Sequence, residues 1–247
     1  MFVSPFTSVV RKSMTRTGEC VYCGVVAALT DDHVPPKNLF PKPRPSNLVT
    51  VLSCRKCNAE TSRDDEYFRL ALTMRDDAGE DPTVQQLLPV VARSLSKPRK
   101  IGFRRSFFRS IGDVEVRTPA GVILGSRKGY RVDLTRLERV VRRTALGLFY
   151  HHRSSRLPLS YQMVALASRR VAGFRKEQAE KLRQLVLEPL WAVPEKSIGN
   201  NVFSYRHVFL DTDPNESAWL MVFFGRVSFV CFSGKPREPS NKGKSAG

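Results

Sequence analysis

Four cysteines fall into two pairs of identical spacing, which is the clearest chemical signal in the chain. Two residues separate Cys20 from Cys23, and two separate Cys54 from Cys57. Each pair can present two sulfurs to one point, and four thiolates suit tetrahedral Zn²⁺. The thirty residues between the pairs exceed the roughly 15–20 of an ordinary zinc ribbon. We therefore expect a structural zinc ion with a further element built between its two pairs of ligands.

That intervening stretch carries side chains suited to hydrolysis. Asp32 and His33 lie within it, and Asn58 directly follows the last cysteine of the second pair. An imidazole with a pKa near ~6.5 can take a proton from water at neutral pH, and carboxylate and amide oxygens bind hard cations. From the residues alone, plainer interpretations stay open. Asp32 and His33 can form a hydrogen-bonded pair in a turn, Asn58 can be a polar residue of a first helical turn, and Asn47 can be a turn residue.

The order of these motifs resembles that of the HNH nucleases, also called His-Me finger or ββα-metal nucleases. The resemblance covers roughly residues 19–70 and is greatest to the zinc-binding branch of the family. The matching residues are Cys20-x-x-Cys23, Asp32-His33-Val34-x-Pro36, Asn47-Leu48-Val49 and Cys54-x-x-Cys57-Asn58. It implies a β-hairpin followed by a helix, with one divalent ion, Mg²⁺ or Mn²⁺, held between them.

The resemblance also implies a role for each polar residue. His33 would be the general base that deprotonates the attacking water, while Asp32 and Asn58 would hold the catalytic ion. Asn47 would fix the hairpin loop and orient His33. The helix after Asn58 departs from the family, because it begins Ala59-Glu60-Thr61-Ser62 where many relatives carry a lysine that meets the phosphate backbone.

The charge balance points to a polyanionic partner. The chain has 41 Lys and Arg against 23 Asp and Glu, a net charge of +18, which favours nucleic acid first and an anionic membrane surface second. No run reaches the ~18–20 apolar residues of a membrane span, and the basic pair near the N-terminus follows the apolar residues, the wrong order for a secretory signal. Paired cysteines of this kind indicate a reducing compartment. We expect a cytoplasmic protein that binds nucleic acid, and the resemblance to HNH nucleases implies double-stranded DNA.

Two segments concentrate this positive charge. Residues 97–110 alternate cations with phenylalanines, and both a nucleic-acid-binding arm and an amphipathic helix with a solvated basic face fit this pattern. The helix expected over 134–151 places Arg142 and Arg143 opposite its apolar positions. The cations of the first segment that we expect to contact phosphates are Lys100, Arg104, Arg105 and Arg109.

Periodicity and turn residues predict the remaining elements. Five prolines between Val34 and Pro45 predict an extended loop, and Ser62 can cap the helix that follows the second cysteine pair. Thr135 and Glu138 form a capping box for the helix over 134–151. Further predictions are a strand over 47–52, short strands within 113–133, a helical region over 161–188 that ends at Pro189, and strands over 202–209, 218–224 and 227–232.

Together with the resemblance to HNH nucleases, these elements predict an α+β fold, a zinc-stapled ββα-metal finger followed by a mixed α/β C-terminal domain. The function expected is that of a metal-dependent DNA endonuclease; the alternative is a non-catalytic, zinc-stabilised nucleic-acid-binding protein. A protein partner or a homodimer would use the C-terminal domain. The segments are a flexible leader over 1–18, the nuclease core over 19–75, a basic domain for nucleic-acid or partner binding over 76–233 and a disordered tail over 234–247.

Overall fold

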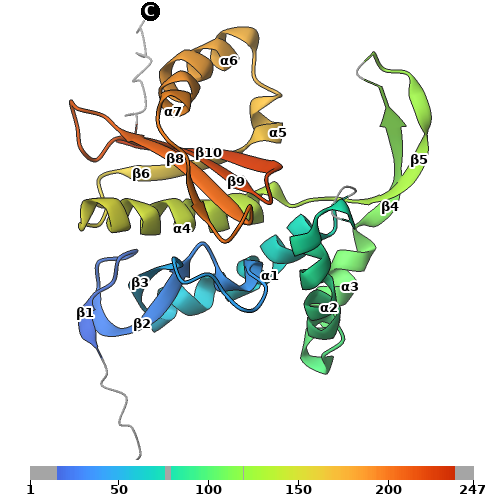
Figure 1. Ribbon diagram of the computed structural model, residues 1–247, viewed down its shortest axis with the longest axis horizontal. Helices are drawn as coiled ribbons and strands as arrows, with labels where there is room; N and C mark the ends of the chain where they lie inside the picture. Colours follow the sequence, from blue (N-terminus) through green and yellow to red (C-terminus); the bar gives the residue numbers. More distant parts are fainter. Residues whose placement is uncertain (1–15, 76–78, 119, 237–247) are drawn as a thin grey trace, which may run out of the picture.

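The computed structural model describes residues 16–75, 79–118 and 120–236 (Figure 1). Most of the expected leader and tail lies outside these ranges. Within them, helices and strands are mixed along the chain, which confirms the α+β fold class. None of the helices in the described ranges is both long and apolar enough to span a membrane.

The N-terminal part is a three-stranded antiparallel sheet followed by a helix. Its strands β1 (Thr17–Glu19), β2 (Val26–Val34) and β3 (Val49–Cys54) lie in the order β1-β2-β3, and α1 (Arg55–Thr73) begins directly after β3. We call β1, β2, β3 and α1 the finger. The proline-rich loop between β2 and β3 is irregular apart from one 3-10 turn at Lys37–Leu39, as its prolines predict.

Helix α1 starts earlier than predicted. The sequence favoured Ser62 as its cap, but the N-cap is Cys54, whose sulfur accepts a hydrogen bond from the backbone N–H of Cys57 at 3.4 Å. Ser62 lies inside the helix and donates instead to the carbonyl of Ala59. The side chain of one paired cysteine thus satisfies one of the backbone donors that every helix start leaves free.

Two helices and a ribbon connect the finger to the rest of the chain. Helix α2 (Pro82–Leu95) was not predicted, although Asp81 caps it and Pro82 occupies its first turn. A 3-10 turn (Pro98–Lys100) leads into α3 (Ile101–Arg109). Helix α3 buries Phe107 and leaves Phe108 51% exposed, so residues 101–109 form an amphipathic helix, and the nucleic-acid-binding role of this segment stays a prediction. Strands β4 (Ile111–Arg117) and β5 (Ile123–Tyr130) then form a two-stranded sheet of their own.

The C-terminal part is a five-stranded antiparallel sheet with helices on both faces (Figure 1). Helix α4 (Leu134–Arg153) packs on one face, and the other carries a helical stretch of α5 (Ser168–Val171), α6 (Lys176–Leu182), a π-helical turn (Arg183–Leu187) and α7 (Glu188–Ala192). The strands lie in the order β6-β10-β9-β8-β7 and are β6 (Gln162–Ala167), β7 (Lys196–Ile198), β8 (Phe203–Phe209), β9 (Ser217–Phe223) and β10 (Val227–Gly234).

The helical region predicted over 161–188 is confirmed in its second part, where α5, α6 and the π-helical turn lie, but its start, its end at Pro189 and the capping box of α4 were wrong. The helical region expected over 161–188 begins with β6, because antiparallel pairing with β10 recruits this short apolar run into the sheet. The capping box of α4 does not form. Asp133 caps that helix, and the carboxylate of Glu138 accepts instead from the backbone N–H of Ala167 and from Arg170. Pro189 occupies the first turn of α7 rather than ending a helix.

Helix α4 lies between the finger and the five-stranded sheet (Figure 1). Val34 of β2, Leu148 of α4 and Trp219 of β9 belong to one continuous buried cluster. Phe68 of α1 also meets Phe223 of β9 edge to face, with ring centroids 4.9 Å apart. The finger and the sheet therefore share a hydrophobic core, while the domain boundary after residue 75 stays a prediction.

Close packing of α4 on the finger makes Gly147 sensitive to substitution. A Cβ atom there would lie 2.5 Å from Cγ2 of Val34, which is 1% exposed. We expect Gly147→Ala to lower the free energy of unfolding by about 1–3 kcal/mol, as overpacking does, although alanine favours helices. The matched control is Gly102→Ala in α3, where a Cβ meets nothing within 4 Å and stability should stay equal or rise by up to about 1 kcal/mol. Urea denaturation measures the free energy of unfolding of both variants. A Gly147→Ala protein more stable than the wild type would contradict the close contact between α4 and Val34.

Candidate functional site

The four paired cysteines converge at one end of the finger, as the spacing predicted. Their sulfur atoms all lie within 4.8 Å of one another, and those of Cys23 and Cys54 are 3.8 Å apart. A tetrahedron of Zn–S bonds near 2.3 Å has edges of about 3.8 Å. Cys20 and Cys54 are buried, and Cys23 and Cys57 are half-buried. This cluster could hold a metal ion such as Zn²⁺.

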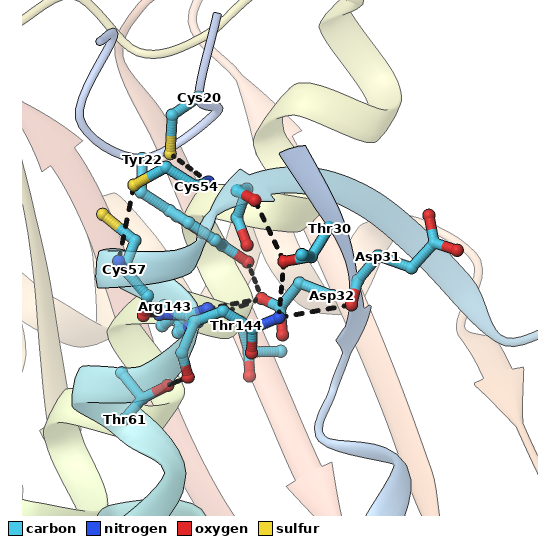
Figure 2. Close-up of polar contacts among 12 residues, drawn as sticks. Cys20, Tyr22, Thr30, Asp31, Asp32, Cys54, Cys57, Thr61, Arg143 and Thr144 are labelled. Atoms are coloured by element: carbon cyan, nitrogen blue, oxygen red, sulfur yellow. Dashed lines mark hydrogen bonds and ion pairs between the residues drawn. The ribbon is translucent and has the colours of Figure 1, made fainter. Parts of the chain in front are cut away.

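Backbone hydrogen bonds to sulfur affect the pKa values of the cysteine cluster. The N–H of Cys54 donates to the sulfur of Cys20 at 3.3 Å (Figure 2). Burial alone would raise the pKa of Cys20, but the backbone donors of Cys54, Cys23 and Tyr22 outweigh it and lower that pKa to about 7. At Cys57, burial and the neighbouring thiols raise the pKa. Four thiolates can therefore coexist here only if a positive charge neutralises them.

Asp32 lies on β2 and binds an arginine from α4. Its Oδ2 accepts hydrogen bonds from Tyr22 Oη at 2.6 Å and from Arg143 Nε and Nη2 at 3.0 and 2.8 Å (Figure 2). Arg143 also donates to the backbone carbonyl of Cys57. The side chains of Asp32 and Arg143 are 13% and 12% exposed. This buried ion pair connects α4 to the strand that carries the candidate site.

The burial of Arg143 corrects the sequence interpretation. The sequence placed it on a solvated basic face beside Arg142, but only Arg142 is exposed. The guanidinium of Arg143 instead lies over the ring of Tyr22, 4.2 Å from its centroid. No local pattern marks this position, because its partners are 111 and 121 residues away in the sequence.

Asn58 joins the first turns of α1 to β2 next to Asp32. Its Nδ2 donates to Thr30 Oγ1 at 3.0 Å and to the carbonyl of Asp31 at 3.3 Å. Oδ1 of Asp32 and Oδ1 of Asn58 accept no hydrogen bond from the described residues. The two expected oxygen ligands thus come from adjoining elements, and each keeps one oxygen available. This donor set fits a hard divalent cation.

His33 follows Asp32 on β2 and helps to line a small cavity. Asp32, Asp65 and Thr144 help to line this cavity of about 10 Å³, close to the volume that one water needs. Burial, and next the positive charge of Lys37, lower the pKa of His33 below its ordinary value, against the opposing effect of Asp32. Its imidazole is therefore neutral at pH 7 and forms no hydrogen bond within the described part of the chain.

Asp65 is a residue of this cavity that sequence reasoning missed. It lies on α1, and burial raises its pKa to about 7. Its Oδ1 is buried without a hydrogen-bond partner among the described residues. Asp65 follows Asn58 by seven positions, which is two helical turns and so the same face of α1. That spacing could have identified it. A proton or a cation would satisfy this oxygen.

The other expected site residues lie elsewhere or already have partners. Asn47 is exposed, and its Nδ2 donates to the carbonyl of Ser197 on β7 at 3.1 Å, so its observed contact is with the large sheet. Its role in orienting His33 stays a prediction. Lys100 forms an ion pair with Glu66, and Arg104 donates to the carbonyl of Leu95 at 3.4 Å. Arg105 and Arg109 are exposed and form no ion pair with any described residue.

Comparison with known proteins identifies no relative of this chain. Nothing matches the chain among protein-family models, curated proteins or solved structures. The cysteine cluster and the junction of β2 with α1 therefore carry the functional argument by themselves.

Proposed function

We propose that this protein is a metal-dependent endonuclease of the HNH kind that hydrolyses phosphodiester bonds in DNA. The observation that carries the proposal is the junction of β2 and α1, where Asn58 contacts β2 next to Asp32 and where Asp32 and His33 line the same small cavity. The hairpin and helix have the order that the resemblance implies, and the cysteine cluster holds β3 and α1 at that junction. The net charge of +18 supports DNA as the substrate.

Each group has a distinct role in this proposal. Zinc bound by the four cysteines would fix the position of α1 relative to the hairpin. Asp32 and Asn58 would hold Mg²⁺ or Mn²⁺, which when bound supplies positive charge for the phosphate and the leaving oxygen. His33 would accept the proton of the attacking water. Tyr22 and Arg143 hold the Asp32 carboxylate through its other oxygen and so position it.

The second candidate is a zinc-stabilised nucleic-acid-binding protein without catalysis. One observation favours it specifically. Arg143 already neutralises Asp32 in a buried ion pair, as it would if that carboxylate served only to hold α4 against the finger. In this case, DNA binding would persist without strand cleavage in the presence of any divalent metal.

The cellular setting belongs to the same proposal. All five cysteines are free, which fits a reducing compartment, and we place the protein in the cytoplasm. A protein partner or a second copy of the chain would contact the C-terminal part. Neither is needed for the chemistry assigned to His33.

Nicking of supercoiled plasmid DNA tests the function. With Mg²⁺ or Mn²⁺ present, we expect the wild-type protein to cut and His33→Ala to cut about 10²–10⁴-fold more slowly, the usual contribution of a general base. The control is His151→Ala, which removes an exposed imidazole from the last turn of α4 and should leave the rate unchanged. Equal rates for wild type and His33→Ala, or a wild-type protein that binds DNA but never cuts it, would refute the proposal.

A further inference from the structure

Strands β4 and β5 form a ribbon that projects away from the body of the molecule (Figure 1). Within the described chain they pair only with each other, and nearly all of their side chains are exposed or half-exposed. An isolated two-stranded ribbon is only marginally stable in water. A shift in register between Val116 and Arg117, opposite Gly125 with its φ of 139°, increases the twist. Both faces of this ribbon are exposed, and the outer edge of each strand is unpaired within the described chain. These features are typical of a segment that binds a partner.

The ribbon and the adjoining α3 hold much of the charge surplus of the chain. Residues 97–131 include ten Lys and Arg but only two Asp and Glu, a net charge of +8 out of the total of +18. Each acid has a partner within the ribbon, since Asp113 pairs with Lys128 and Glu115 with Arg117. Five exposed arginines of this stretch form no ion pair with described residues, namely Arg99, Arg105, Arg109, Arg127 and Arg131.

The far end of the ribbon is apolar instead of charged. Val122, Ile123 and Leu124 are 60%, 53% and 68% exposed. Three large aliphatic side chains at the end of a basic ribbon differ from an ordinary solvated turn, which would carry polar residues. They supply a contact that does not depend on charge.

We propose that this ribbon lies in a groove of double-stranded DNA, with its cations on the phosphates and its apolar end against the bases. The major groove admits a two-stranded ribbon, and strands of about seven residues extend roughly 23 Å, about two-thirds of a helical turn of 34–36 Å. Aliphatic side chains contact thymine methyl groups or wedge between base steps. The choice of DNA rests on the proposed function, but the binding itself needs neither His33 nor a divalent metal.

Two other occupants fit these observations less well. A lipid bilayer would leave the outer N–H and C=O groups of both strands without partners, whereas water in a DNA groove satisfies them. A second ribbon would bring another surplus of positive charge against Arg127 and Arg131, and like charges repel. Charge complementarity therefore favours the DNA duplex.

Fluorescence anisotropy with a labelled 20-base-pair duplex in EDTA tests the proposal over a range of salt concentrations. We expect Arg127→Gln combined with Arg131→Gln to weaken binding and to reduce the slope of log K against log[salt] by about 2, because each lost phosphate contact removes about 0.9. We expect Ile123→Ser combined with Leu124→Ser to raise Kd about tenfold while the salt slope is unchanged, because apolar contacts release no counterions.

The control is Lys176→Gln combined with Lys196→Gln, which removes two exposed cations from α6 and β7 and should leave Kd and slope nearly unchanged. All of these side chains are exposed, and equal thermal stability would show that the fold is intact. Ribbon variants that bind as the wild type does would overturn the proposal. The proposal would also be overturned if the ribbon variants bound DNA normally and changed only the mass measured by sedimentation, which would indicate self-association. The same holds if they changed only binding to vesicles with 30% phosphatidylserine, which would indicate a membrane surface. Binding that depends on the ribbon without any cleavage would refute the nuclease but not this interface.

Discussion

Replacement of Cys54 by serine is expected to abolish metal binding and to unfold the finger. Cys54 supplies a sulfur to the cluster, caps α1 and ends β3, so one substitution removes three functions. Structural zinc contributes about 10–16 kcal/mol in zinc-finger peptides. A loss of half of that, about 5–8 kcal/mol, would equal the whole stability of a marginally stable domain. Zinc analysis of the purified protein and urea denaturation, with and without a chelator, measure the two effects.

The control for this experiment is Cys231→Ala. Cys231 is buried in β10 and is the one cysteine outside the cluster, so the variant should keep its full zinc content while losing some packing energy. If the Cys54→Ser protein retains one equivalent of tightly bound zinc, the assignment of the cluster is wrong. Wild-type stability that a strong chelator leaves unchanged would lead to the same conclusion.

Arg143→Met is expected to be among the most destabilising substitutions outside the cysteine cluster. It leaves the carboxylate of Asp32 nearly buried with Tyr22 as its remaining side-chain partner. Removal of one member of a buried ion pair costs about 3–5 kcal/mol. Methionine keeps much of the aliphatic bulk that packs beside Tyr22, so the loss reports mainly on the charge. Chemical denaturation measures the change in the free energy of unfolding.

A double-mutant cycle with Asp32→Asn separates the pair from its surroundings. The double variant should be clearly more stable than the sum of the two single losses predicts, since it contains no uncompensated charge. Arg142→Met is the matched control because its side chain is exposed on the same helix, and its effect should stay within about 0.5 kcal/mol. Losses that simply add would show that Asp32 and Arg143 do not act as a pair.

The convergence of the four cysteines could be predicted from the sequence because its signal is local. Two residues between paired cysteines determine which way the sulfurs point, whatever the rest of the fold does. The start of α1 was missed for a related reason. Its cap is the sulfur of Cys54, whereas the capping rules single out oxygen side chains such as that of Ser62.

Long-range contacts account for the other misses. The apolar run over residues 162–167 suits a buried strand or a buried helix equally, and pairing with β10 decides between them. Arg143 cannot be told from its neighbour Arg142 by sequence, because burial of a guanidinium requires partners such as Asp32 and Tyr22 from a distant segment. Asp65 could have been predicted as a site residue, because it lies seven positions after Asn58 and so on the same face of a helix.

The position of α4 between the finger and the large sheet affects how the protein unfolds locally and exchanges its amide hydrogens. Helix α4 contributes buried side chains to a core that the finger and the sheet share, so its central amides should exchange only when that core opens. Loss of the ion pair to Asp32 or of the packing at Gly147 would loosen its hold on the sheet as well. The two halves should therefore protect their backbone amides together, as a single cooperative unit.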